Sequence, residues 1–338
     1  MSLIANWSYP TSIRFGAGRI VEIADACKTI GITKPLLVTD RGLAKLDITF
    51  KTLDLLSKAG LGRSIFSEVD SNPTEINAIA GIKMFIEGKH DGVIAFGGGS
   101  GIDLGKLVAF MIGQKRPIWD FEDIGNWWTR AETNKIMPII AIPTTAGTGS
   151  EVGRASVITN SQTKEKKIIF HPKFLPKIVI CDPELTVGMP LSITSGTGMD
   201  AFAHCLEAYC SPHYHPMSQG MALEGMRLVK ENLPIVYKDR NNIRGRSHMM
   251  SAAIMGATAF QKGLGAIHAA SHPIGAVHNT HHGTTNAVVM REALLMNRSA
   301  IEPKIESLCN YLEISGGFDG FLSFVFNLNK VLNIPTSL

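Results

Sequence analysis

The chain has few cysteines and few charged residues for its length. Its 338 residues include five cysteines, an odd number without Cys-x-x-Cys spacing. We therefore expect reduced thiols in a cytoplasmic protein, with no disulfide framework. Charged residues make up 18% of the chain, and its formal net charge is +4. Because no basic block is long enough to follow a phosphate backbone, nucleic acid is not expected as a partner.

Long apolar runs are also missing. No run reaches 18 apolar residues, so no membrane span is expected. The first ten residues lack the charged and apolar leader of a secretory signal. The chain does have 45% hydrophobic residues and 33 glycines spread among apolar runs, which is typical of a well-packed globular enzyme. A chain of this length is expected to form two domains.

The hydrophobic pattern changes partway along the chain. In the first half, short apolar runs alternate with helical patterns. The strand candidates are residues 35–40, 92–96, 138–142 and 177–181. Continuous apolar strands separated by helices predict a parallel sheet covered on both faces. From residue 192 onward the sequence predicts only successive helices, of which the last is placed at 303–312. We therefore expect an α/β domain over 1–188 and an all-helical domain over 189–338.

Four residues form a candidate ligand set for one divalent metal ion. Asp200 and His204 are four positions apart, so on a helix their side chains share a face. His268 and His282 follow later in the chain. One carboxylate and three imidazoles suit Fe(II), Zn(II) or a neighbouring metal, and they tolerate an open position for a substrate. Spacing alone leaves the alternative that these are separate structural histidines.

A glycine-rich segment follows the strand candidate 92–96. The run Gly97–Gly99 allows backbone amides to crowd around an anion, and Ser100 can cap a helix whose positive end faces a pyrophosphate. Asp103 lies three residues after Ser100, as in a capping box. The alternative is a tight turn without a ligand. The pattern is also not the GxGxxG of the ordinary dinucleotide fold, which belongs in the first strand-to-helix turn.

Two further segments suit a nucleotide. Asp40 ends the first strand candidate, where a carboxylate can accept from both ribose hydroxyls of an adenosine. Its charge would repel a 2′-phosphate, which favours NAD over NADP; the alternative is an Asp that starts a turn before Gly42. The polar loop 143–152 follows a buried strand candidate. Its hydroxyls and glycines suit a phosphate, ribose or carboxamide, and a generic loop is the alternative.

Four long motifs then identify a family. They run in order along nearly the whole chain, over residues 97–103, 143–151, 198–209 and 263–275. Together they resemble the iron-containing (group III) alcohol dehydrogenases. The resemblance implies a dehydroquinate-synthase-like fold, with an N-terminal dinucleotide-binding domain, a helical metal-binding domain and an active site in the cleft between them. It also implies that this chain is truncated at its C-terminus relative to the family.

The resemblance assigns roles to individual residues. The metal ligands it implies are Asp200, His204, His268 and His282. The positions it places around NAD are Gly98, Gly99, Ser100, Asp103, Thr144, Thr145, Thr148 and Lys166. Asp40 matches the position that disfavours NADP, and Asn72 resembles an adenosine-side contact. His272 could be a ligand, an orienting residue or a proton relay; the family favours the relay.

The expected activity is a metal-dependent NAD(H) alcohol dehydrogenase or aldehyde reductase that interconverts a small primary alcohol or diol and its aldehyde. A metal would act as a Lewis acid on the alcohol oxygen, and the nicotinamide would carry the hydride. Family habit favours Fe(II), with Zn(II) as the alternative. A glycerol-type polyol dehydrogenase, a hydroxyacid-oxoacid transhydrogenase and a non-catalytic nucleotide-binding protein with a structural metal are the other hypotheses. We also expect a homo-oligomer.

Overall fold

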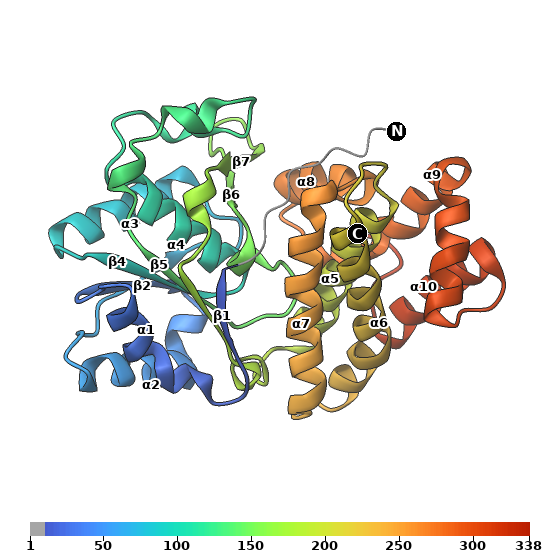
Figure 1. The fold of residues 1–338 in the computed structure, drawn as a ribbon, viewed down its shortest axis with the longest axis horizontal. Helices are drawn as coiled ribbons and strands as arrows, with labels where there is room; N and C mark the ends of the chain where they lie inside the picture. The colour runs from blue at the N-terminus through green and yellow to red at the C-terminus, as the bar shows by residue number, and fades with distance from the viewer. Residues whose placement is uncertain (1–10) are drawn as a thin grey trace. The chain divides into compact units, whose positions relative to one another are not determined.

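The computed structural model describes residues 11–338. Their contacts divide the chain into two units (Figure 1). The first unit contains residues 11–144 and 150–185, and the second contains residues 145–149 and 186–338. A five-residue segment from the first half of the chain therefore packs with the second unit, although its neighbours on both sides belong to the first.

The first unit is built on a parallel sheet of six strands in the order β1-β8-β5-β4-β2-β3. Its strands are β1 (Ser12–Phe15), β2 (Pro35–Asp40), β3 (Ile65–Val69), β4 (Gly92–Gly97), β5 (Ile139–Pro143) and β8 (Ile178–Cys181). A separate antiparallel pair consists of β6 (Ala155–Thr159) and β7 (Lys166–Phe170). The predicted parallel sheet is confirmed, and the four strand candidates coincide with β2, β4, β5 and β8.

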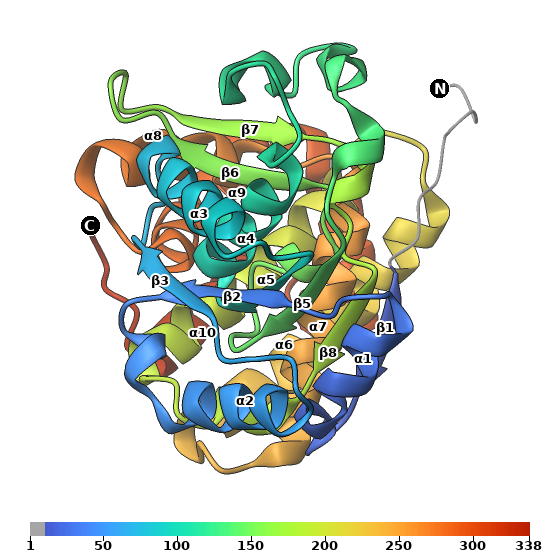
Figure 2. The same ribbon diagram turned by 90° about the vertical axis from the view of Figure 1, so that its left-hand side faces the viewer.

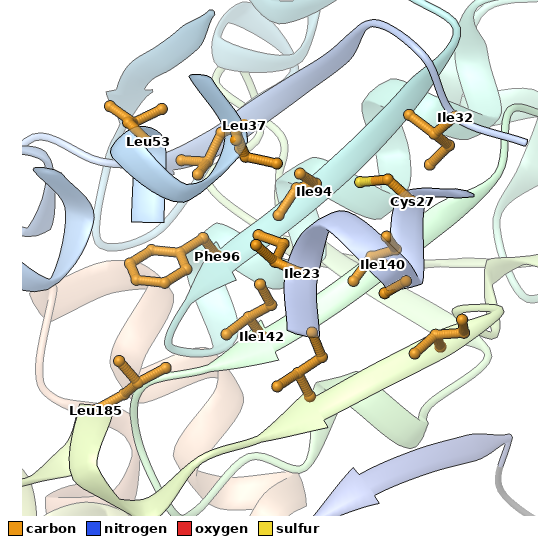
Figure 3. Close-up of a cluster of buried hydrophobic side chains, with 14 residues drawn as sticks. Ile23, Cys27, Ile32, Leu37, Leu53, Ile94, Phe96, Ile140, Ile142 and Leu185 are labelled. Carbon is orange, nitrogen blue, oxygen red and sulfur yellow. The ribbon is translucent and has the colours of Figure 1, made fainter. Parts of the chain in front are cut away.

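Helices cover both faces of this sheet. They are α1 (Ile23–Thr29), α2 (Asp47–Lys58), α3 (Glu75–Glu87) and α4 (Gly99–Met111). Figure 2 shows α1 and α2 on one face and α3 and α4 on the other. Figure 3 shows the core under α1, where Ile23 and Cys27 meet Ile94 and Ile140 from the central strands. Covering both faces explains why the inner strands are continuous apolar runs.

The second unit contains six α-helices. They are α5 (Leu191–Cys210), α6 (Pro216–Lys238), α7 (Ile243–Ala259), α8 (Ala266–His278), α9 (His282–Leu312) and α10 (Gly317–Val331). The segment 303–312, expected to be a helix of its own, is the last part of α9. Every residue of α5 from Thr194 to Tyr209 is buried, because α6, α7 and α9 pack around it. None of the helices within residues 11–338 has the length and apolar character needed to cross a membrane.

Candidate metal centre and cofactor loops

Four side chains from three helices meet inside the helical unit. Asp200 and His204 lie on α5, and His268 lies in the first turn of α8; one ligand atom of each lies within 4.8 Å of the others. His282 is the first residue of α9. The Nε2 atoms of the three histidines lie 3.8, 3.7 and 3.4 Å from Asp200 Oδ1, in chain order. The structure thus brings all four sequence-predicted ligands around one carboxylate oxygen.

The protonation of this cluster suits a cation. Burial lowers the pKa of His204 to about 4 and that of His282 to about 3. Burial opposes ionisation of Asp200, but the neighbouring histidines outweigh it and hold the pKa of its carboxyl well below the usual range. Burial is likewise outweighed at His268, where interactions with Asp200 and Glu207 raise the pKa to about 9, so this imidazole must release a proton when a metal binds. One ionised carboxylate and two neutral imidazoles are the forms in which these groups bind metal.

The geometry also fits a cation. A carboxylate and the bare nitrogen of a neutral imidazole are both hydrogen-bond acceptors. Acceptors that face one another in a buried site are unfavourable unless a positive charge lies between them. Asp200, His204 and His268 are each less than 5% exposed. The donor set therefore fits a divalent ion of the Fe(II) or Zn(II) type.

Two buried polar residues beside the cluster were missed by the sequence analysis. The Nδ2 atom of Asn286 donates to Asp200 Oδ1 at 2.7 Å and lies 3.3 Å from the Nε2 atoms of His268 and His282. Glu207 Oε2 accepts from Nδ1 of His268 at 2.5 Å. The available signal was helical spacing, because Glu207 comes three residues after a predicted ligand and Asn286 comes four after another.

His272 lies next to the cluster. Its ring centroid is 5.9 Å from that of His268 and 5.3 Å from that of His282. The side chain is half-buried, in contrast to the fully buried His268. The ring of Phe260 lies 5.2 Å from that of His204. His272 is therefore a neighbour of the ligands with partial access to solvent.

In the sheet unit, six of the predicted cofactor residues gather at the carboxyl ends of the strands. Asn72, Asp40, the run Gly98–Ser100 and Thr144 follow or end strands β3, β2, β4 and β5 at their carboxyl ends. These four strands are consecutive neighbours in the sheet. The backbone N–H of Thr144 donates to the carbonyl of Gly97 at 2.9 Å, which joins two of the loops. The carboxyl edge of a parallel sheet is where ligands bind in open α/β folds.

The glycine loop differs in detail from its expected form. Gly98 is the N-cap of α4, and Ser100 lies inside the helix, where its Oγ donates to the carbonyl of Ser71. Ser100 is therefore not the cap, because the chain has already turned into the helix at Gly99. Gly97 has a φ of +145°, a value that favours glycine. The hydroxyl of Ser100 instead ties the glycine loop to the loop after β3.

Asp103 forms its bonds within the protein. Its Oδ1 accepts from the hydroxyl of Ser150 and lies 3.1 Å from Lys106 Nζ, and its Oδ2 accepts from the backbone N–H of Val157 at 3.0 Å. The side chain of Lys106 is 1% exposed. Asp103 thus joins α4 to Ser150 of the polar loop and to Val157 of β6. Its carboxylate stabilises the positions of the proposed cofactor loops through these bonds. It does not complete a capping box with Ser100.

The remaining cofactor candidates lie in three different settings. Asp40 Oδ1 accepts from the backbone N–H groups of Gly42 and Leu43 at 2.9 and 2.8 Å, so the turn-forming interpretation of Asp40 holds. Lys166 is the first residue of β7. Thr145 and Thr148 belong to the segment that packs with the helical unit. The predicted set is therefore not one contiguous surface of the sheet unit.

Comparisons with known proteins give consistent matches. The family described as "Iron-containing alcohol dehydrogenase" matches residues 10–183, and "Fe-containing alcohol dehydrogenase family, C-terminal" matches residues 194–338. The 4-hydroxybutyrate dehydrogenase of Cupriavidus necator is 37% identical, over 98% of this chain and 87% of that protein. The NAD-dependent methanol dehydrogenase of Bacillus methanolicus is 32% identical, over 93% and 80%. A crystal structure of 1,3-propanediol oxidoreductase superimposes with a TM-score of 0.92 at 32% identity, covering 98% and 88%.

Proposed function

This chain belongs to the iron-containing alcohol dehydrogenase family, and from that premise we propose that it interconverts a small primary alcohol or diol and its aldehyde. The resemblance seen in the sequence is confirmed, and with it the class of enzyme: an NAD-dependent, iron-family alcohol dehydrogenase. The substrate and the role of each residue form the proposal. We further propose that residues 1–188 form an NAD-binding domain and residues 189–338 a metal-binding domain.

The metal would be held by Asp200, His204, His268 and His282. The observation that carries this assignment is the approach of three Nε2 atoms to within 3.8 Å of Asp200 Oδ1. When bound, a divalent ion supplies a Lewis acid that lowers the pKa of an alcohol oxygen. Asp200 would offset part of its charge, and the neutral imidazoles would leave net positive charge for the substrate. We propose iron from the family, although the ligand set also accepts zinc.

NAD would bind at the carboxyl edge of the sheet. Gly98 and Gly99 would offer the N-terminus of α4 to the pyrophosphate, with Ser100 beside them. Asp40, with Oδ1 engaged in the turn, would use its other oxygen and its charge to select NAD over NADP. The further contacts that we propose from the family are Asn72, Thr144, Thr145, Thr148 and Lys166, while Asp103, which the family also places around NAD, has a different role. The bonds of Asp103 within the protein support a role in holding the loop and not a direct cofactor contact.

His272 would carry a proton. It is half-buried and lies beside two of the proposed ligands, so its imidazole has both a site neighbour and a route to solvent. Histidine suits this task because its ordinary pKa is near neutral pH. We propose that His272 exchanges the alcohol proton with solvent when substrate and cofactor are bound.

The substrate class is supported by the relatives. The substrates in the names of the three relatives above, 4-hydroxybutyrate, methanol and 1,3-propanediol, all carry a primary hydroxyl. A glycerol-type polyol dehydrogenase is the second candidate, and a hydroxyacid-oxoacid transhydrogenase that keeps its NAD bound is the third. A panel of primary alcohols, diols, glycerol and hydroxyacids, followed by NADH absorbance, separates them. Turnover without net NADH would favour the transhydrogenase.

Two alanine variants test the metal and proton roles together. His268→Ala is expected to lose bound metal and turnover, whereas His272→Ala keeps its metal and loses turnover. Elemental analysis and anaerobic aldehyde reduction measure both quantities, and His248→Ala on α7 is the matched control, with neither expected to change. Full metal content in His268→Ala would contradict the ligand assignment. Unchanged turnover in His272→Ala would contradict the relay.

We also propose a cytoplasmic homo-oligomer. All five cysteines, which lie within residues 11–338, are free thiols, which supports a reducing compartment. Helix α3 exposes Ile76, Ile79 and Ile86, each by more than half, and exposed apolar side chains on one helix support self-association. Light scattering on the purified protein measures the oligomeric state, and a monomer at micromolar concentration would contradict it.

A further inference from the structure

Glu207 is a buried carboxylate beside the four proposed metal ligands. Each of its oxygens accepts a hydrogen bond from within the protein. It lies on α5, seven residues after Asp200, so both side chains leave the same face of the helix. Its Oε2 accepts from Nδ1 of His268 at 2.5 Å, and its Oε1 accepts from the backbone N–H of Ile267 at 2.6 Å. The residue is 6% exposed. Both donors belong to the first turn of α8.

The start of α8 is shaped to receive this carboxylate. Gly265 is the N-cap of the helix, and a Cβ at that position would lie 3.1 Å from Glu207 Oε1. Glycine therefore leaves room that a larger residue would fill. The unpaired N–H groups at a helix start also favour a negative charge. Glu207 thus fixes the first turn of α8 and the ring of His268 with a single group.

The contact decides which nitrogen of His268 faces the proposed ion. In the neutral form that binds metal, an imidazole carries one N–H, and a carboxylate can only accept, so the proton of that form belongs on Nδ1. The Nε2 lone pair then faces the cluster, 3.7 Å from Asp200 Oδ1. We propose that Glu207 is a positioning residue that sets the tautomer and orientation of His268 for metal binding. This inference rests on the proposed function, because it concerns the ion held there.

The variant Glu207→Gln tests this role. The amide replaces one accepting oxygen by a donor, so it cannot accept from both Ile267 and His268. It favours the His268 tautomer with the proton on Nε2, which must be lost before a metal binds. We expect the zinc dissociation constant, measured by competition with a chelating dye, to rise about 10–100-fold. Glu224→Gln on α6, whose carboxylate bonds to Arg227, is the matched control and keeps the wild-type affinity.

Nuclear magnetic resonance of the zinc-loaded, ¹⁵N-histidine-labelled protein gives a readout independent of activity. The wild type should show His268 bound to zinc through Nε2, with a strongly deshielded proton on Nδ1. That proton should shift or exchange rapidly in Glu207→Gln. This spectrum also decides the matter if the variant does not fold, because zinc bound through Nδ1 in the wild type overturns the proposal.

The outcomes separate the inference from its premise. A folded Glu207→Gln with wild-type zinc affinity and an unchanged His268 spectrum overturns the positioning role and leaves the metal site standing. A wild-type chain that binds neither zinc nor iron overturns both. Weakened binding in the variant alone, with Glu224→Gln unaffected, supports the positioning role.

Discussion

The side-chain amide of Asn286 donates a 2.7 Å hydrogen bond to Asp200 Oδ1, the oxygen on which the three imidazoles converge. Asn286 is fully buried and Asp200 is 3% exposed. A hydrogen bond from a neutral donor to a buried carboxylate contributes more than one between neutral groups. Asn286 on α9 therefore holds the Asp200 carboxylate of α5 in place.

The first prediction concerns this bond. Asn286→Ala should lower the free energy of unfolding by about 1.5–3 kcal/mol and weaken zinc binding roughly tenfold or more, because Asp200 loses its donor. Asn232→Ala is the matched control, since Asn232 is also buried but donates to a carbonyl of its own helix. Asn232→Ala should lower the free energy of unfolding by about 1 kcal/mol and leave zinc binding unchanged. Urea unfolding and chelator competition measure the two effects, and equal zinc affinity in both variants would contradict the role of Asn286.

The second prediction concerns the choice of dinucleotide. Asp40→Asn keeps an oxygen that accepts from Gly42 and Leu43, so the turn is retained while the charge is removed. We expect the ratio of kcat/KM for NADP over NAD to rise about tenfold or more, since one charge-charge contact near a protein surface is worth on the order of 1–4 kcal/mol. Asp47→Asn, at the exposed start of α2, should leave the ratio unchanged. An unaltered ratio in Asp40→Asn would remove Asp40 from cofactor selection.

The inner strands could be predicted from the sequence because they are buried on both faces. The two strands of this sheet that were missed, β1 and β3, are its edge strands, and most of their residues are partly exposed. The separate pair β6 and β7 was also missed. Edge strands lack the continuous apolar run that marks a central strand. The helix predicted at 303–312 continues upstream through Pro303, which is exposed within α9. A proline is not a certain helix boundary when neighbouring turns hold the helix.

The four proposed metal ligands could be selected from the sequence because they follow helical spacing and the family motifs. Glu207 and Asn286 could not be assigned, because a polar residue near a ligand is equally compatible with an exposed helix face. The packing of α5 against α9 and the bonds of Glu207 to the first turn of α8 place them in the interior. The packing of segment 145–149 with the second unit could not be predicted from the sequence either. Its placement depends on contacts such as that of Gly147, where a Cβ would lie 2.6 Å from the carbonyl oxygen of Thr197.

The third prediction concerns pH. Burial raises the pKa of the Glu151 carboxyl from 4.5 to about 7. The folded state therefore holds this proton more tightly than the unfolded state. Its contribution to stability is fully present below pH 4.5 and is lost as the pH rises through about 7. Glu151→Gln keeps a neutral side chain at every pH and should not show this loss.

Urea unfolding at pH 4.5 and pH 8 measures the effect. The free energies of unfolding of the two proteins should differ little at pH 4.5. At pH 8, that of Glu151→Gln should exceed that of the wild type by up to roughly 3 kcal/mol. Glu165→Gln, at an exposed position, should not alter the pH dependence. A constant difference between Glu151→Gln and the wild type at both pH values would show that Glu151 is ionised in the folded protein throughout this range.

The fourth prediction concerns the contact of α5 with α9 beside the four proposed metal ligands. Gly283 is the second residue of α9, and a Cβ there would lie 2.1 Å from the carbonyl oxygen of Gly196 and 3.0 Å from Asp200 Cβ. Gly283→Ala must therefore push the two helices apart. It should lower the free energy of unfolding by about 1–3 kcal/mol or more. It should also weaken zinc binding, because His282 lies on α9 and Asp200 on α5, so that separating the helices separates these two proposed ligands.

The control is Gly220→Ala on α6, where nothing lies within 4 Å of the added Cβ. Its free energy of unfolding should be unchanged or should rise by up to about 1 kcal/mol, because alanine has the higher helix propensity. Equal unfolding midpoints for the two variants would mean that α9 can shift without cost, and the close approach would then not be what holds the ligands together.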